Sequence, residues 1–349
     1  MPPAAPSEVV RAWWKEWGDA GQRSDLSEPR AAGVALRAAH AAGVLDLPLP
    51  AHGSTAARWS GLAALGEADL TLARLGEAHA DAVAILAELD GPPPPPGSLW
   101  GVWAAEPPGA TVHAVLDSAG DTWRLSGRKA WCSGARIYTH ALVTARSEDG
   151  PRLFALDLAD TGVRPVEGGW AALALTGSDT LAVDLDDAPA VPVGRPGAYV
   201  DRPGFWHGAA GVAACWYGGA RGVAATLVKA ARRRDVGPHA FAHLGALDAA
   251  LTAAGDGLRA ASAAADAALT DTADAELNAR RVRAVAEAVA ADAIDRVGRA
   301  LGPTPLAGDR AHARRVADLA LYVRQSHAER DLADLGRLVA SRTEEGARW

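Results

Sequence analysis

The stretch GRKAWCSGA, residues 127–135, places an aromatic ring, a hydroxyl group and two basic side chains within a few positions of one another. A strand that only fills a core does not need this mixture. The indole of Trp131 can stack on a planar ring, and the hydroxyl of Ser133 can donate a hydrogen bond to the polar edge of such a ring. These residues predict one wall of a site for a planar ligand. A core tryptophan on a β-strand is the competing interpretation.

Two histidines and one glutamate are candidates for proton transfer. His207 lies in the segment 203–219, which contains no Asp or Glu, and His327 and Glu329 lie in the segment 317–336. A histidine can act as a general base near neutral pH. Each of the three has an ordinary alternative as a packed or solvent-facing side chain, because charged residues at such density usually form a solvated face.

The elements that must position these residues change type along the chain. Apolar residues recur at three- and four-residue steps within residues 7–90, which predicts helices over 29–42 and 66–90. Five consecutive prolines within 91–97 cannot continue a helix and predict a stiff, extended spacer. Short runs rich in Val, Leu, Trp and Thr fill residues 98–200, separated by Gly, Asp and Pro, and predict about seven strands in a small barrel or sandwich.

The helical period returns after residue 205. It predicts four long helices, with a hard break at GPTPLAG, residues 302–308. These helices are expected over 207–233, 238–269, 273–301 and 309–340.

Composition restricts the kinds of partner that the protein can bind and the cellular compartment in which we expect it. The chain has 349 residues, a net charge of −7 and only two cysteines, which lie far apart and form no metal-binding spacing. An acidic protein without a basic patch is a poor partner for nucleic acid or an anionic membrane. We find no signal peptide pattern and no apolar run long enough to span a bilayer. The expected compartment is therefore the cytoplasm, and no metal is predicted.

Four stretches, taken in their order, resemble the acyl-CoA dehydrogenase family over nearly the whole chain. They are WAAEP (103–107), GRKAWCSGARIYTHALVTAR (127–146), LTGSDTLAVDLDDAPAVP (175–192) and RRDVGPHAFAHLGALDAAL (233–251). The resemblance implies an α+β multidomain protein of the acyl-CoA dehydrogenase type. Its expected parts are an N-terminal helical domain (1–97), a central β-barrel domain (98–200) and a C-terminal four-helix domain (201–349).

The resemblance also implies an FAD cofactor between the barrel and the C-terminal helices. It assigns Trp131 to the face of the flavin ring, Ser133 to its polar edge, and Ala104 and Ala105 to a strand end beside it. Ala105 stands where the family has a threonine, so one hydroxyl contact to the flavin is missing.

Two further residues are assigned to FAD by the same resemblance. Arg233 would bind the diphosphate, as a guanidinium matches phosphate oxygens, and Gly302 would let backbone approach the cofactor of a neighbouring subunit. On the residues alone, Arg233 is equally well a solvated member of an arginine run, and Gly302 a glycine that ends a helix. The two prolines that follow Gly302 remove N–H donors that the family's loop provides.

The implied function is an FAD-dependent oxidoreductase acting on a CH–CH group, in which a base removes the α-proton of an acyl thioester and a hydride passes to flavin N5. The family's glutamate base falls here on Ser326. Glu329 returns to nearly the same helical face three residues later, so Glu329, His327 and His207 remain the catalytic candidates.

Two alternatives stay open. One is a flavin-dependent monooxygenase on the same scaffold, and the other is a non-catalytic binding or assembly module. The resemblance further implies a small-molecule substrate, with an acyl-CoA as one candidate, and a homodimer or homotetramer. The sequence does not identify the electron acceptor.

Overall fold

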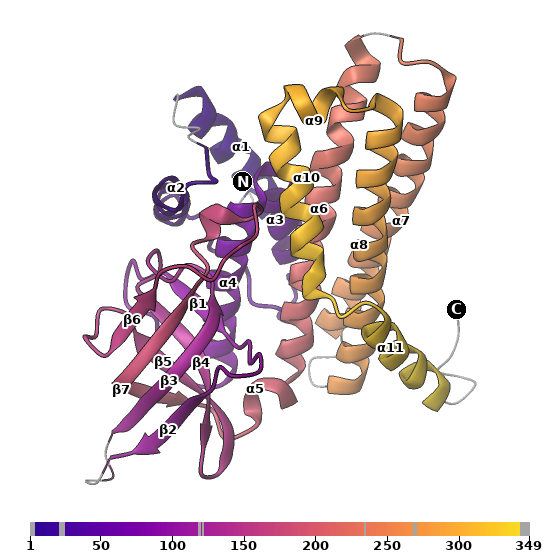
Figure 1. Ribbon diagram of the computed structural model, residues 1–349. Helices are drawn as coiled ribbons and strands as arrows, with labels where there is room; N and C mark the ends of the chain where they lie inside the picture. The colour runs from indigo at the N-terminus through magenta and orange to yellow at the C-terminus, as the bar shows by residue number, and fades with distance from the viewer. Residues whose placement is uncertain are drawn as a thin grey trace. The chain divides into compact units, whose positions relative to one another are not determined.

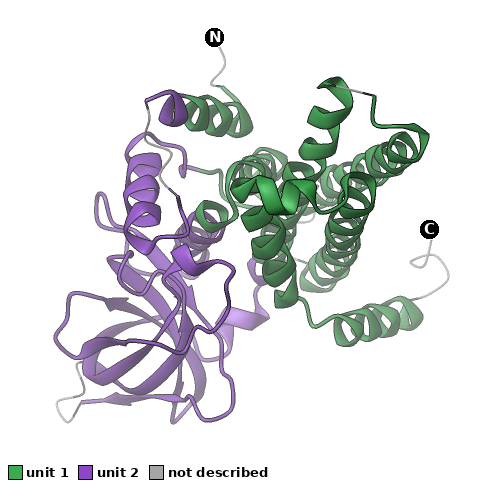
Figure 2. Ribbon diagram, turned by 45° about the horizontal axis from the view of Figure 1, so that its top comes forward, with its two compact units in different colours: residues 1–15, 47–73, 206–349 green, residues 16–46, 74–205 purple. Residues whose placement is uncertain are grey.

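The computed structural model describes residues 4–20, 25–117, 120, 122–233, 235–267 and 271–342. The chain divides into two compact units (Figure 2). Unit 1 comprises residues 1–15, 47–73 and 206–349, and unit 2 comprises residues 16–46 and 74–205. Each unit therefore combines segments that are distant in the sequence. The division into domains 1–97, 98–200 and 201–349 stays a prediction.

The first part of the chain is helical, as its apolar spacing predicts. Its helices are α1 (Pro6–Asp19), α2 (Pro29–Ala41), α3 (Thr55–Ala68) and α4 (Leu70–Glu88). The single helix expected over 66–90 is wrong at its start, because Asp69 has an extended backbone with φ −158°. Its carboxylate Oδ1 accepts hydrogen bonds from the backbone N–H groups of Thr71 (2.9 Å) and Leu72 (3.1 Å). Asp69 therefore ends α3 and caps the N-terminus of α4.

Unit 2 contains the β-barrel. Its strands are β1 (Trp100–Trp103), β2 (Val112–Leu116), β3 (Trp123–Cys132), β4 (His140–Ser147), β5 (Gly150–Asp157), β6 (Val163–Val166) and β7 (Leu181–Val193). The hydrogen-bonded order is β1-β4-β2-β3-β7-β5, and β5 also pairs with β4. The strands β4, β2, β3, β7 and β5 thus form a closed ring, while β1 and β6 pair at its sides. The prediction of seven strands in a small barrel is confirmed.

Apolar side chains fill the barrel and cover one of its outer faces. Leu125, Val143, Phe154 and Val183 are among the fully buried residues of the interior. On the outside, residues of α4 including Ile85 pack against apolar residues of β1, β4, β5 and β7. Because side chains on both faces of these strands are buried, the strand sequences are runs rich in Val and Leu.

The C-terminal helices belong mostly to unit 1, where α6, α7, α8 and α10 run side by side (Figure 1). The short α5 (Ala198–Asp201) precedes α6 (Pro203–Arg233), α7 (Pro238–Ala267), α8 (Thr272–Leu301), α9 (Thr304–Gly308), α10 (Arg310–Tyr322) and α11 (Glu329–Ser341). The first three long helices are confirmed, except that 268 and 269 lie outside the described residues. The prediction of one continuous fourth helix over 309–340 is wrong. Residues 323–328 between α10 and α11 are not α-helical, and Ala328 has φ +46°.

The helices α3 and α6 of unit 1 approach each other through glycines. A Cβ on Gly218 of α6 would lie 2.0 Å from the carbonyl oxygen of Ala63, and a Cβ on Gly66 of α3 would lie 2.2 Å from that of Cys215. Only glycine allows this backbone contact. No helix within the described residues is both long and apolar enough to cross a membrane.

Candidate functional site

In unit 2, strand β3 turns the ring of Trp131 outward by an irregularity in its pairing. The register with β7 shifts between Lys129 and Cys132, and Trp131 adopts a left-handed backbone with φ +55°. In a regular strand, residues two apart share one face, and Trp131 would point inward like the buried Lys129. The bulge breaks this alternation, so the indole is 58% exposed. The interpretation of Trp131 as a core residue is therefore wrong.

Ser133 lies just beyond the bulge in a network of hydroxyl groups. Ser133 is 6% exposed, and its Oγ lies 2.9 Å from Thr180 Oγ1, which in turn lies 2.8 Å from Ser178 Oγ. The backbone N–H of Gly134 donates to the carbonyl oxygen of Ser178 at 2.7 Å. These bonds fix the segment after β3 against the turn before β7. Because the Ser178 hydroxyl donates to the carbonyl oxygen of Leu175 at 2.6 Å, Thr180 donates to Ser178 and Ser133 donates to Thr180.

Ala104 and Ala105 directly follow β1 and are half-buried. The indole Nε1 of Trp103, the last residue of β1, donates to the carbonyl oxygen of Ser133 at 2.9 Å. This bond joins the end of β1 to the segment after β3. Ala104, Ala105 and Ser133 therefore lie in one region of unit 2. Trp131 belongs to the same region, because it precedes Ser133 by two residues in the chain.

Lys129 anchors the same region from inside the barrel. Its Nζ donates to the carbonyl oxygen and the Oγ1 of Thr144, at 2.9 and 2.7 Å, and lies 3.7 Å from Glu106 Oε1. Thr144 Oγ1 donates to the same carboxylate at 3.1 Å. Burial lowers the pKa of Lys129, and the charge of Glu106 opposes this change. Because Glu106 follows Ala105, the buried lysine fixes the strand end that carries both alanines.

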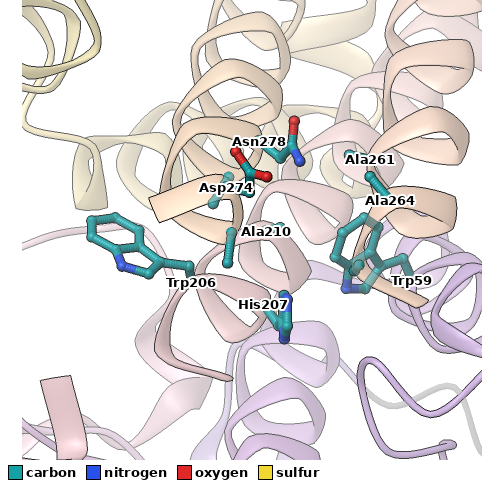
Figure 3. Close-up of a pocket in the computed structure, with 11 residues that line it drawn as sticks. Trp59, Trp206, His207, Ala210, Ala261, Ala264, Asp274 and Asn278 are labelled. Carbon is teal, nitrogen blue, oxygen red and sulfur yellow. The ribbon is translucent and has the colours of Figure 1, made fainter. Parts of the chain in front are cut away.

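Unit 1 contains a pocket lined by α3, α6, α7 and α8 (Figure 3). Trp59, Trp206, His207, Asp274 and Asn278 supply its larger side chains, and alanines of α6, α7 and α8 supply most of the remainder. The pocket has about 300 Å³ of empty space, counted with its opening to solvent. The alanines make its walls apolar, while Asp274 and Asn278 lie one helical turn apart on α8.

Of the three catalytic candidates, only His207 lines this pocket. His207 is 5% exposed. His327 and Glu329 are exposed and lie at the interruption before α11, with the His327 Nδ1 3.5 Å from Asp331 Oδ1. Ser326 is buried, and its Oγ accepts the backbone N–H of Ala328 at 3.1 Å. The position that the family resemblance gives to a catalytic glutamate is therefore a buried hydroxyl that stabilises a turn.

The two remaining candidates lie at helix ends of unit 1. Arg233 is exposed at the last residue of α6. Gly302 follows α8 with φ +64°, and its N–H donates to the carbonyl oxygen of Gly298 at 2.8 Å. Gly302 is thus the glycine that ends α8, which agrees with the structural interpretation of this residue.

The sequence did not single out Trp59, Asp274 or Asn278. Nothing in the local pattern marks them, because Trp59 lies on α3 and the other two on α8, and these two helices meet only in the folded protein. The position of Lys129 in an apolar strand was a weak indication of a site, because a buried lysine needs a polar or charged partner. Among the described residues, no group of three His, Cys, Asp or Glu side chains could hold a metal ion.

A helical segment, a small closed barrel and a long-helix bundle, in this order, define the acyl-CoA dehydrogenase fold, and the chain has this fold. No protein-family model matches the sequence, and no curated protein matches it either. Among solved structures, the chain is similar to FMN-bound TdsC from Paenibacillus sp. A11-2, with a TM-score of 0.80, 18% identity and 96% of each chain covered. TdsC is described as a dibenzothiophene monooxygenase.

Two other solved structures share the fold. KijD3 in complex with FMN and a dTDP-linked amino-keto sugar has a TM-score of 0.79 at 17% identity, covering 100% of this chain and 96% of that chain. A variant of the Tcur3481-Tcur3483 steroid ACAD has a TM-score of 0.74 at 22% identity, covering 98% and 97%.

Proposed function

We propose that this chain is a flavin-dependent oxidoreductase, and that FAD is its cofactor. The observation that carries the proposal is the indole of Trp131, which a bulge in β3 turns out of the barrel in a protein of the acyl-CoA dehydrogenase fold. An exposed indole offers a flat apolar surface on which a planar ring can stack. Similar structures of this fold were solved with FMN bound, which supports a flavin in general.

The neighbouring residues fit a flavin ring. Ser133 Oγ donates its proton to Thr180 and can still accept a hydrogen bond from an N–H at the ring's polar edge. Ala104 and Ala105 leave room beside the ring because their side chains are methyl groups. Arg233 belongs to unit 1, and its exposed guanidinium has the charge and geometry to bind a diphosphate. A bound flavin would supply the hydride acceptor at its N5 atom.

For the reaction, the acyl thioester dehydrogenation expected from the sequence needs a base near the substrate carbon. Glu329 is the carboxylate proposed for this role, and it is exposed at the first turn of α11. A flavin-dependent monooxygenase is the second candidate. The buried Ser326 at the family's base position favours it, together with the buried His207 as an acid or base.

The first experiment is an absorbance spectrum of the purified protein, followed by identification of the released cofactor as FAD or FMN. Trp131→Ala should weaken flavin binding roughly tenfold through the lost stacking. Trp131→Phe keeps a flat ring and should retain most of the affinity. Fluorescence titration with FAD and FMN measures both variants.

Val115 provides a matched control, because it is also an exposed apolar residue of the barrel, 64% exposed. Val115→Ala should leave flavin affinity unchanged. If the wild-type protein binds neither FAD nor FMN, the oxidoreductase proposal fails and a non-catalytic binding or assembly module becomes the better account.

The second experiment separates the two reactions. Saturated acyl-CoA compounds are added without oxygen to the flavin-loaded protein, and the flavin absorbance near 450 nm is followed. Dehydrogenation predicts bleaching, which Glu329→Gln should abolish if Glu329 is the base. A monooxygenase predicts no bleaching by any acyl-CoA, and oxygen consumption only after the flavin has been reduced by another reductant.

A further inference from the structure

Three buried hydroxyl groups form a chain that starts at Ser133. Ser133 and Thr180 are each 6% exposed, and Ser178 is 1% exposed. The hydroxyl oxygen of Thr180 lies 2.9 Å from that of Ser133 and 2.8 Å from that of Ser178. The chain ends where Ser178 Oγ lies 2.6 Å from the carbonyl oxygen of Leu175. All four residues belong to unit 2.

The carbonyl oxygen of Leu175 gives this chain one direction. A carbonyl oxygen can only accept a hydrogen bond, whereas each hydroxyl has one proton to donate. The Ser178 proton is therefore directed to Leu175. The Thr180 proton is then directed to Ser178, and the Ser133 proton to Thr180. The opposite direction would place a lone pair of Ser178 Oγ against the carbonyl oxygen at 2.6 Å, which is repulsive.

Ser133 can therefore offer a ligand its lone pairs but no donor. Its position is fixed as well, because the backbone N–H of Gly134 donates to the carbonyl oxygen of Ser178 at 2.7 Å. In addition, Trp103 Nε1 donates to the carbonyl oxygen of Ser133 at 2.9 Å. The hydroxyl thus has a defined place and a defined direction before a ligand binds, which is the condition for selective recognition of one charge or protonation state.

An acceptor distinguishes between the oxidised and the reduced form of a flavin ring. In the oxidised ring only N3 carries a proton, while N1, N5 and two carbonyl oxygens are acceptors, and reduction by two electrons adds a proton at N5. The N3–H group lies between the two carbonyl oxygens, whereas N5 has one carbonyl neighbour. A single buried oxygen with lone pairs therefore meets less repulsion at a protonated N5 than at N3, and it is repelled by the lone pair of an unprotonated N5.

We propose that Thr180 and Ser178 are positioning residues that make the flavin site favour the reduced ring, because they hold the hydroxyl of Ser133 as an acceptor for the N5–H group. This inference rests on the proposed flavin function and deepens it. Thr180 and Ser178 act only through Ser133, so neither has to contact the ring.

The test measures the midpoint potential of FAD bound to the full-length protein, by reduction in equilibrium with a reference dye. Thr180→Val keeps the shape of the side chain and removes its hydroxyl, so that Ser133 becomes free to donate to the oxidised ring. Its affinity for reduced relative to oxidised FAD should fall about tenfold, which lowers the potential by about 30 mV. Ser178→Ala should change the potential in the same direction, because the Thr180 proton loses its acceptor. Thr180→Ser restores the hydroxyl and should restore the wild-type potential.

Thr176→Val is the matched control. Thr176 belongs to η1 (Thr176–Ser178), and its Oγ1 donates to the carbonyl oxygen of Ser27 at 2.7 Å, outside the chain. This variant loses a hydroxyl hydrogen bond of the same turn, and it should keep the wild-type potential even where its stability falls.

The outcomes separate this inference from the proposed function. If the wild type binds FAD and both Thr180→Val and Ser178→Ala leave its potential unchanged or raise it, the inference is wrong while the flavin proposal stands. An equal drop in Thr176→Val would also overturn it, because a general loosening of the turn would then be the cause. If the wild type binds no flavin, both proposals fail. If Thr180→Val does not fold, Ser178→Ala decides the question.

Discussion

At the scale of single residues, His79 of α4 is a buried titratable group of unit 2. His79 is 4% exposed, and its ring meets that of His40 edge to face, with the centroids 4.9 Å apart. Its Nδ1 accepts the backbone N–H of Trp100 at 3.2 Å, so the neutral ring holds the first residue of β1. Burial, and secondarily the nearby His40, lowers the pKa of His79 from 6.5 to about 4.

This lowered pKa predicts acid sensitivity. Between pH 6.5 and about 4 the unfolded chain binds a proton that folded His79 does not, so the free energy of unfolding falls as the pH falls through this window. The loss from this residue is on the order of 3 kcal/mol at most. Denaturant titrations at pH 7 and pH 4.5 measure it.

His79→Gln removes the titration and keeps a hydrogen-bond acceptor for Trp100, so its stability should depend less on pH than that of the wild type. His113 is exposed on β2, and His113→Gln should leave the pH dependence unchanged. An equally steep pH dependence in His79→Gln would show that other groups cause the acid sensitivity.

At the scale of elements, the contact between α3 and α6 predicts a large effect of one methyl group. Gly218→Ala would place a Cβ 2.0 Å from the carbonyl oxygen of Ala63, so one helix must move. We expect the free energy of unfolding to fall by at least about 2 kcal/mol, as in overpacked cores. Urea denaturation followed by circular dichroism measures the change.

Gly245 of α7 is the matched control, because a Cβ there would meet nothing within 4 Å. Gly245→Ala should raise stability by roughly 0.5–1 kcal/mol, since alanine favours helix more than glycine does. Equal and small effects of the two substitutions would mean that the helices do not approach as closely as described.

The elements themselves were largely predictable, and their interruptions were not. Repeated apolar spacing predicted the long helices and the barrel strands, because burial imposes that spacing. The break at Asp69 could be explained only once the structure was known. An aspartate before an apolar run can cap a helix, but it does not have to. The interruption before α11 leaves Ala328 at a positive φ. An alanine in the sequence gives no indication of this conformation.

The candidate site was predictable only in part, for a similar reason. The motif around Trp131 could be recognised, but the outward direction of its ring depends on a bulge between β3 and β7. Trp59 and Asn278 could not be found, because a pocket formed by separate helices depends on packing. His207 could be named as a candidate, while its burial in that pocket required the structure.

At the scale of the whole molecule, the two compact units do not follow the order of the chain. Residues 47–73 belong to the same unit as residues 206–349, and the barrel of unit 2 lies between them in the sequence. Local patterns predict the type of each segment, but which distant segments pack together depends on contacts of long sequence separation. A prediction made segment by segment therefore divides the chain into consecutive domains, as in the predicted division into 1–97, 98–200 and 201–349.

The glycine contact between α3 and α6 has a consequence for how a cell makes this protein. The ribosome completes α3 early, yet its partner surface on α6 leaves the exit tunnel only after the whole barrel has been made, on the order of ten seconds later at ordinary rates of synthesis. During that interval the face of α3 that carries Ala63 and Gly66 has no α6 to pack against, so the packing of this part of unit 1 can be completed only after α6 has been made.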